Sequence, residues 1–249
     1  MTNMHGWKYI YMETVDSTNS EAKRRALEGK TEDTLIHAGA QTAGRGRIAR
    51  RWESPKGAGI WMTQLFAPQG IAAKDAGGAV FLSAVSLCRA LRELTNAEVI
   101  IKWPNDLVLS GKKICGMLAE CGMAQAQCAW IALGTGLNLT ARALPGELIY
   151  ASGIYEETGL MLRPEEVFDK YLAYFNEARN IWEREGLTPI IDMMRPVSAT
   201  LNREVRVNGE HAFAVDIASG GELIIRADDG ALRSVVAGDV SVRGITDYA

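Results

Sequence analysis

Glycines and arginines alternate in one short segment of this chain, in a pattern that could bind an anion. The segment Gln41–Trp52 reads QTAGRGRIARRW and contains two glycines and four arginines. Glycine lets backbone N–H groups approach an anion closely, and arginine supplies a fixed charge with forked donors for carboxylate or phosphate. Trp52 adds a flat face on which a ring can stack. We predict a loop that closes over a phosphorylated or adenylated ligand; a solvated basic loop or a nucleic-acid patch is the alternative.

A second polar cluster follows an apolar stretch. The sequence Lys-Trp-Pro-Asn-Asp occupies positions 102–106, where Pro104 fixes a turn. Lys113 begins the next apolar stretch, so its ammonium group either reaches solvent or meets an anion in a pocket, and Gly116 permits close approach of a ligand. The short spacing from Asn105 to Lys113 across a tight turn predicts one shared site. A well-capped turn is the alternative reading.

Two further polar groups could recognise a small ligand. Ser17-Thr18-Asn19 lies where a helix is predicted to begin, so its hydroxyls and N–H groups could bind a polar head group or simply cap the helix. Asn138 could bond to an adenine edge or terminate its strand. The lone Gly134-Thr135-Gly136 marks a close backbone approach, because Leu139 replaces the third glycine of a dinucleotide fingerprint.

The composition is that of a globular protein with a substantial core. The chain has 249 residues, of which 47% are hydrophobic and 23% charged, and its net charge of −3 argues against a dedicated DNA-binding protein. The cysteines lack zinc-binding spacing, so we expect buried free thiols in a reducing cytoplasm; they are Cys88, Cys115, Cys121 and Cys128. No signal peptide and no membrane-spanning run is predicted.

Hydrophobic periodicity predicts an α+β fold. A strand at 7–15 leads into a helix that begins at Thr18, with Glu21 completing a capping box and Gly29 at its C-terminal end. Further strands are predicted at 34–41, 59–66, 97–102, 106–109, 113–121 and 128–139, and further helices after Asp75 and over 164–185.

The pattern changes near residue 196, where short alternating strands separated by glycine-containing turns begin. They predict a small antiparallel barrel over 196–249. The preceding residues, 1–195, are predicted to form a main domain with a mixed, mostly antiparallel sheet and packed helices.

The order of these motifs resembles that of the biotin protein ligases. The resemblance runs from about residue 9 to the end of the chain and rests on Ser17-Thr18-Asn19, Gln41–Trp52, Lys102–Asp106, Lys113-x-x-Gly116 and Gly134-x-Gly-x-Asn138. Residues 238–244 are similar to the last strand of that family's C-terminal domain. The resemblance implies a class II synthetase-like catalytic domain followed by an SH3-like barrel.

The resemblance also implies a two-step reaction. Biotin and ATP, with Mg²⁺, give biotinoyl-5′-adenylate, and a lysine of a biotin carboxyl carrier domain then attacks the activated carbonyl. Because a carboxylate and a phosphate must be brought together, Lys113 and Arg47 are the expected catalytic residues. The residues implied to bind biotin are Ser17, Thr18, Asn19, Gln41, Gly44, Arg45, Gly46, Arg47, Lys113 and Gly116. Those implied to bind the nucleotide are Arg45, Arg47, Arg50, Trp52, Asn105, Asp106, Lys113 and Asn138, and no metal ligand is firmly assigned.

Two departures from the family pattern change these expectations. Only 16 residues precede Ser17, so the N-terminal helix-turn-helix of some members, and DNA binding through it, is not expected. Thr140 stands where the family often has a second asparagine, which removes the basis for one minor nucleotide contact. A homodimer is compatible with the resemblance. A ligase for lipoate or another carboxylic acid, and a non-catalytic biotin-binding relative, are the alternatives.

Overall fold

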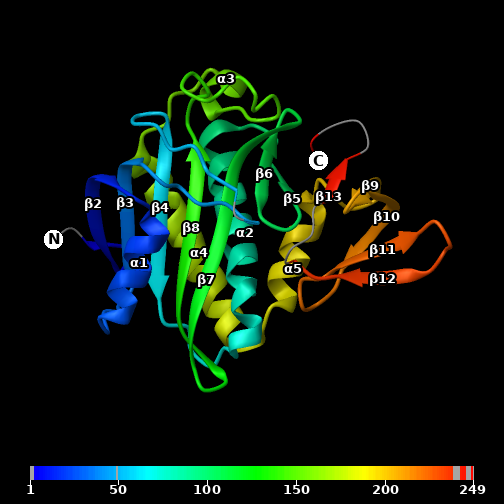
Figure 1. Ribbon diagram of the computed structural model, residues 1–249, viewed down its shortest axis with the longest axis horizontal. Coiled ribbons are helices and arrows are strands. Elements are labelled where there is room, and N and C mark those ends of the chain that lie inside the picture. The colour runs from blue at the N-terminus through cyan, green and yellow to red at the C-terminus, as the bar shows by residue number, and fades with distance from the viewer. Residues whose placement is uncertain (1–2, 49, 238–241, 245–247, 249) are drawn as a thin grey trace.

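A mixed β-sheet forms the centre of the molecule (Figure 1). The computed structural model describes residues 3–48, 50–237, 242–244 and 248. Over these residues, eight strands form one sheet in the order β1-β2-β3-β4-β8-β7-β6-β5. β2 and β3 pair parallel and the other neighbours pair antiparallel, which confirms the predicted mixed, mostly antiparallel sheet. The strands are β1 (Asn3–Met4), β2 (Trp7–Val15), β3 (Thr34–Gln41), β4 (Gly59–Phe66), β5 (Ile100–Lys102), β6 (Asp106–Leu109), β7 (Lys112–Ala124) and β8 (Gln127–Asn138).

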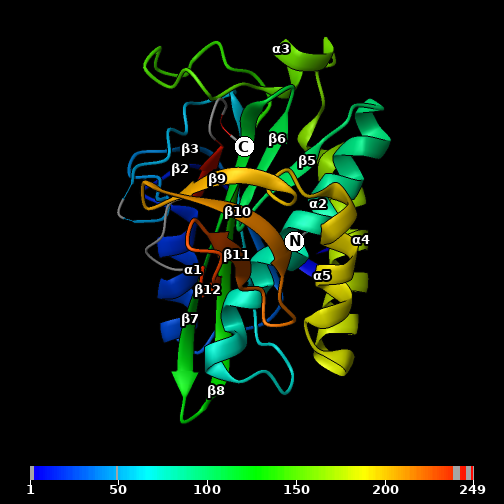
Figure 2. The same ribbon diagram turned by 90° about the vertical axis from the view of Figure 1, so that its right-hand side faces the viewer.

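Helices cover both faces of this sheet. α2 (Ala79–Thr95) and α4 (Pro164–Glu185) pack side by side on one face (Figure 2). α1 (Thr18–Leu27) packs on the other. Side chains alternate along a strand, and β3 shows the consequence: Leu35 joins the large core with α2 and α4, whereas Ile36 joins a smaller core with α1. α4 has the predicted bounds, and its apolar side is buried; the buried residues are Val167, Phe168, Tyr171, Leu172, Phe175, Ala178 and Trp182.

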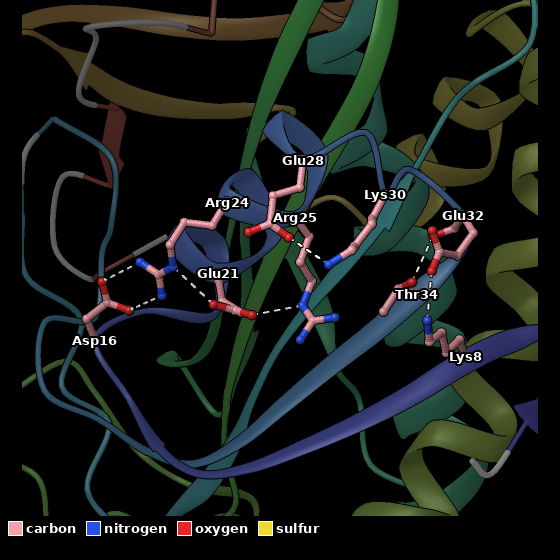
Figure 3. Close-up of polar contacts among 9 residues, drawn as sticks. All are labelled: Lys8, Asp16, Glu21, Arg24, Arg25, Glu28, Lys30, Glu32 and Thr34. Atoms are coloured by element: carbon pink, nitrogen blue, oxygen red, sulfur yellow. Dashed lines mark hydrogen bonds and ion pairs between the residues drawn. The ribbon is translucent and has the colours of Figure 1, made fainter.

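The start of α1 differs from the prediction. Ser17 is the N-cap, in extended backbone and without a side-chain cap bond, so no capping box forms at Thr18. The Glu21 carboxylate accepts hydrogen bonds from Arg24 (3.0 Å) and Arg25 (2.8 Å) instead, as Figure 3 shows. The predicted capping box is wrong because these arginines, three and four residues further along the helix, compete for the carboxylate.

Two predicted turns have the expected backbone. Gly29, just past the end of α1, has φ +78°, a conformation that glycine adopts without strain. Ser110 and Gly111, with φ +51° and +76°, connect β6 to β7 as the primed turn that a two-residue hairpin favours.

Several short elements have no clear signal in the sequence. They are α3 (Ile154–Thr158), α5 (Thr188–Met194), β1 and two 3₁₀ turns at Ala73–Gly78 and Arg195–Val197. Segments of this length are too short for a helical or strand period to be recognised. The strand predicted at 97–102 is also shorter in the structure, where β5 covers only Ile100–Lys102.

A second, antiparallel sheet follows, with order β12-β11-β10-β9-β13 over the described residues. Its strands are β9 (Arg203–Val207), β10 (Glu210–Ile217), β11 (Leu223–Ala227), β12 (Leu232–Val235) and β13 (Val242–Gly244). Of the predicted last strand, positions 238–241 lie outside the described residues. The Trp103 indole donates a hydrogen bond to the Gly221 carbonyl at 2.9 Å, which ties the second sheet to the turn at 102–106.

His37 gives the fold a pH-dependent stability. Its ring is buried among Tyr9, Tyr11 and Phe168, and its Nδ1 lies 2.9 Å from the Tyr9 hydroxyl. Burial lowers the pKa of His37 to about 4, although the nearby Glu165 carboxylate acts in the opposite direction. In the unfolded chain a histidine has a pKa of about 6.5, so the unfolded state takes up a proton below that pH and the folded state does not.

We therefore expect the free energy of unfolding to be largest above pH 6.5 and to fall as the pH drops from 6.5 to 4, by up to about 3 kcal/mol from this residue. Urea titrations of the protein and of His37→Phe at pH 7.5, 5.5 and 4.5 measure it. The difference between the two proteins should change across this window. Parallel pH profiles would show that His37 does not contribute.

Three of the four cysteines are buried free thiols, as expected. They are Cys88, Cys115 and Cys128, whereas Cys121 is exposed, because it lies toward the far end of the β7–β8 hairpin.

Among the described residues, none of the helices has both the length and the apolar character that a membrane span requires. No group of three or more potential metal ligands among His, Cys, Asp and Glu is found there either.

Candidate active site

A cavity of about 340 Å³ lies between the Gln41–Trp52 segment and strands β7 and β8. It gathers residues that are widely separated in the chain. The predicted residues that line it are Ser17, Thr18, Asn19, Gln41, Arg45, Gly46, Arg47, Arg50, Trp52, Asn105, Asp106, Lys113, Gly116 and Asn138. Gly44 does not line this cavity: a Cβ on it would come within 2.3 Å of the Trp52 carbonyl oxygen, so this glycine lets the two ends of the loop pack together.

Two facing glycines make room for the Trp52 indole. Gly116 on β7 and Gly136 on β8 are cross-strand partners. A Cβ on Gly116 would lie 2.8 Å from the indole, and one on Gly136 would lie 2.3 Å from its Nε1. The ring therefore lies flat on bare backbone at the floor of the cavity. The buried indole N–H and the Asn138 amide oxygen have no hydrogen-bond partner in the described part of the chain, which is costly unless a ligand supplies one.

A short ion pair in the cavity joins Lys113 and Asp106. Lys113 Nζ lies 2.6 Å from Asp106 Oδ1, and both side chains are largely buried. The tight β6–β7 hairpin brings the two residues together, within the shared site that the short spacing from Asn105 to Lys113 predicts. Lys113 Nζ also lies 5.1 Å from the centre of the Trp52 ring. The ammonium group thus points into the cavity, which excludes the alternative that it extends to solvent.

Tyr248 and Lys102 add to this cluster from other segments. Lys102 Nζ, in a largely buried side chain, lies 3.6 Å from the centre of the Tyr248 ring. The Tyr248 hydroxyl donates a hydrogen bond to Asp106 Oδ2, and its ring is 6.0 Å from that of Tyr150. The Asp106 carboxylate therefore contacts one ammonium group and one phenol, and a second ammonium group lies over the ring of that phenol.

The arginine loop is anchored on both sides of the cavity. Its ends pair through the Trp52 N–H and the Gly44 carbonyl (3.0 Å). Arg47 Nη1 donates to the Asn105 amide oxygen at 2.7 Å, and Arg45 Nη2 lies 2.9 Å from Glu120 Oε1. Two guanidinium groups are thus held at the edge of the cavity that contains the Lys113 ammonium group.

A neutral polar pocket lies at the N-terminus of α1. The Gln41 side-chain oxygen accepts hydrogen bonds from the Thr18 N–H (2.8 Å) and hydroxyl (3.1 Å), and its amide nitrogen donates to Ser54 (2.8 Å). Ser17 is buried beside them. These donors and acceptors fit an uncharged head group, whereas the charged groups lie toward Lys113 and Arg47.

The two asparagines of the site are held by backbone carbonyls. The Asn105 amide nitrogen donates to Met117 (2.9 Å), and that of Asn138 donates to Ser152 (3.0 Å). Each amide is thereby fixed in orientation, with the Asn105 oxygen accepting from Arg47 and the Asn138 oxygen left without a partner in the described part of the chain. Thr140, the departure noted in the sequence, donates to the Glu156 carboxylate at 2.7 Å and so has a local role in the loop before α3.

Several residues of the site were not predicted from the sequence. The irregular segment 144–151 contributes Leu144, Glu147, Leu148, Ile149, Tyr150 and Ala151 to the cavity lining, and Tyr248 joins them. The segment is held to the site by backbone bonds, for example from the Lys113 N–H to the Tyr150 carbonyl (2.7 Å). It has neither periodicity nor a motif that could have signalled this role.

The arrangement can bring two anions together. Lysine and arginine side chains converge on one end of the cavity, and neutral donors and acceptors lie at the other. Fixed positive charge of this kind stabilises negative charge that develops during acyl or phosphoryl transfer. The nearest cysteine, Cys115, is fully buried and its pKa is raised by burial, so it is not suited to act as a nucleophile.

Known proteins are similar to this chain over most of its length. Residues 11–138 match the biotin/lipoate A/B protein ligase family, and residues 200–243 match the biotin protein ligase C-terminal domain. The biotin--[acetyl-CoA-carboxylase] ligase of Paracoccus denitrificans is 31% identical, over 86% of this chain and 92% of that protein. The bifunctional ligase/repressor BirA of Bacillus subtilis is 27% identical, over 97% of this chain and 76% of that protein. The structure of the biotin protein ligase from Aquifex aeolicus in complex with biotin and ATP superimposes with a TM-score of 0.80 at 27% identity, covering 95% of this chain and 99% of that one.

Proposed function

This chain belongs to the biotin/lipoate A/B protein ligase family, and we propose that it activates biotin with ATP and transfers it to a lysine of a biotin carboxyl carrier domain. The observation that carries this proposal is the division of one cavity into a neutral pocket at Thr18 and Gln41 and a cationic end at Lys113 and Arg47. Biotin has the matching shape, with an uncharged ureido head at one end and a carboxylate at the other. We assign the reaction to a catalytic domain over 1–195 and the barrel to 196–249.

In the first step the biotin carboxylate attacks the α-phosphate of ATP and pyrophosphate leaves. Two anions repel each other on approach, so the step requires positive charge between them. Lys113 lies where its ammonium group can contact both, and it exchanges its contact with Asp106 for the ligands. Arg47 exchanges its contact with the Asn105 amide oxygen for one with the phosphate.

The nucleotide lies over the floor of the cavity. The Trp52 indole offers the adenine a stacking surface, and the Asn138 amide oxygen offers a hydrogen bond that the protein leaves unmade. Arg45 and Arg50, at the cavity edge, add positive charge on the phosphate side.

ATP chemistry of this kind uses Mg²⁺, and the donor set fits the ion. Mg²⁺ is commonly held by one or two carboxylates together with substrate phosphates. Asp106 supplies a buried carboxylate and Asn105 an amide oxygen, at the same turn. When bound, the ion neutralises charge on the phosphates that leave.

In the second step the acceptor lysine attacks the carbonyl of the mixed anhydride and AMP leaves. An acyl adenylate hydrolyses in water, so the site must exclude solvent until the acceptor arrives. The arginine loop, anchored on both sides of the cavity, is placed to do so.

The test is a transfer assay with purified protein, biotin, MgATP and a biotin carboxyl carrier domain. We expect the mass of the carrier to rise by one biotinyl group, only when ATP is present. The acceptor lysine substituted by arginine serves as the matched control and should not gain mass. No gain with biotin, but gain with lipoate on a lipoyl domain, would instead assign the protein to the lipoate branch. Biotin binding without pyrophosphate release would show a non-catalytic binder.

A further inference from the structure

Glu120, on β7, contacts three different parts of the molecule. Its Oε1 lies 2.9 Å from both Arg45 Nη2 and Lys23 Nζ, and its Oε2 accepts a hydrogen bond from the Asn19 side chain at 3.1 Å. Burial opposes ionisation of Glu120, but the hydrogen bonds from Lys23 and Asn19 and the charge of Arg45 outweigh it and lower its pKa. The carboxylate is therefore ionised at neutral pH and pairs with two cations, Lys23 and Arg45.

A chain of hydrogen bonds connects this carboxylate to the neutral pocket. The Asn19 side-chain oxygen accepts from Thr63 at 2.7 Å, and the Thr63 hydroxyl lies 2.8 Å from that of Thr18. Thr18 is bonded to Gln41 at the head of the cavity. Asn19 is held tightly in this chain, since a Cβ on Gly134 would come within 2.0 Å of its side-chain oxygen. Glu120 is thus supported by the same buried network that shapes the head pocket.

The two arginines of the loop have different contacts. Arg47 donates to the Asn105 amide oxygen, whereas Arg45 pairs with the ionised and largely buried Glu120 carboxylate. Both bonds are charge-assisted, because each guanidinium group is a cation. Only the Arg45 bond depends on the charge of Glu120, so removing that charge weakens the Arg45 side of the loop and leaves the Arg47–Asn105 contact in place. Gly46, between the two, lines the cavity.

We propose that Glu120 is a positioning residue of the ligase reaction, which acts through Arg45 to hold the backbone at Gly46 over the bound adenylate. The carboxylate does not line the cavity itself. It fixes the Arg45 side of the loop while Arg47 exchanges its contact with Asn105 for one with the ligand. This inference rests on the proposed function, because the intermediate to be retained is the adenylate.

The experiment compares Glu120→Gln with Lys23→Met. Lys23→Met removes only the ion pair between Lys23 and Glu120, whereas Glu120→Gln removes that pair together with the one to Arg45, so only Glu120→Gln weakens the anchor of Arg45. We expect Glu120→Gln to raise the KM for biotin and the amount of adenylate released into solution by about tenfold each, with kcat for adenylate formation within about threefold. Lys23→Met should match the unsubstituted protein in all three, and thermal melts check that both variants are folded.

A double substitution tests whether the effect passes through Arg45. If it does, Glu120→Gln combined with Arg45→Met should release no more adenylate than Arg45→Met alone, because coupled residues are not additive. Additive release, release by Lys23→Met equal to that of Glu120→Gln, or full retention by Glu120→Gln would each overturn the inference. Failure of the unsubstituted protein to biotinylate the carrier would overturn the proposed function instead.

Discussion

Replacing Lys113 by alanine is expected to reduce the rate of adenylate formation by about a thousandfold, the upper range for removing one preorganised charge from an active site. The Lys113 ammonium group points into the cavity, 2.6 Å from Asp106 and 5.1 Å from the Trp52 ring. Without it the biotin carboxylate and the α-phosphate repel each other unscreened. The Asp106 carboxylate also loses its partner and adds negative charge to the site.

Pyrophosphate release with biotin and MgATP measures this effect. Lys112→Ala is the matched control, because Lys112 is the preceding residue of the same strand and its ammonium group pairs with Glu157 (3.1 Å) outside the site. We expect Lys112→Ala to react at nearly the normal rate, and circular dichroism to show the same fold for both variants. Near-normal turnover of Lys113→Ala would contradict the catalytic role of this lysine.

Replacing Arg47 by glycine is expected to release the adenylate rather than to prevent its formation. Arg47 anchors its side of the loop through Asn105 (2.7 Å) and supplies charge at the phosphate end of the cavity. A glycine removes both and makes the loop backbone more flexible. We expect at least a tenfold increase in free adenylate, since a single guanidinium–phosphate contact is of the order of 1.5 kcal/mol or more.

Released adenylate acylates accessible lysines, so the readout is biotin on a protein that is not a carrier, such as serum albumin. Arg51→Gly is the control for loop flexibility alone, because the Arg51 side chain is mostly exposed and pairs with Glu53 at 3.1 Å. It should leave albumin unlabelled. If Arg47→Gly labels only the carrier domain, Arg47 does not retain the intermediate.

The elements of the main sheet illustrate what local pattern can predict. The strands β2, β3 and β4 and the helix α4 have the bounds expected from the sequence. The strands are runs of strand length, of which β4 is almost continuously buried, and α4 has a helical apolar period that begins at Pro164 and stops before Gly186. The capping box at Thr18 was wrong for one local and one non-local reason. Glu21 bonds to Arg24 and Arg25 on the next turn of the helix, and the Thr18 N–H and hydroxyl bond to Gln41, 23 residues away.

The residues of the candidate site were likewise predicted only where local type and spacing identify them. The sequence identified its charged and glycine-rich segments through residue type and spacing, and one tight turn was enough to predict that Asn105 and Lys113 share a site. It gave no reason to include Tyr248 or Glu120. The contacts of Tyr248 with Lys102 and Asp106, and of Glu120 with Arg45, join positions 75 or more residues apart.

The family, the longer helices and strands, and the chemical types available for binding two anions could thus be read from the sequence, since these depend on order and periodicity along the chain. Tertiary structure alone decided how they meet. The register of β7 with β8 sets Gly116 opposite Gly136 and so opens the floor on which Trp52 lies. The packing of α1 against the sheet brings Asn19 to Glu120. Such contacts are selected by burial and hydrogen bonding across the whole fold, and no local spacing encodes them.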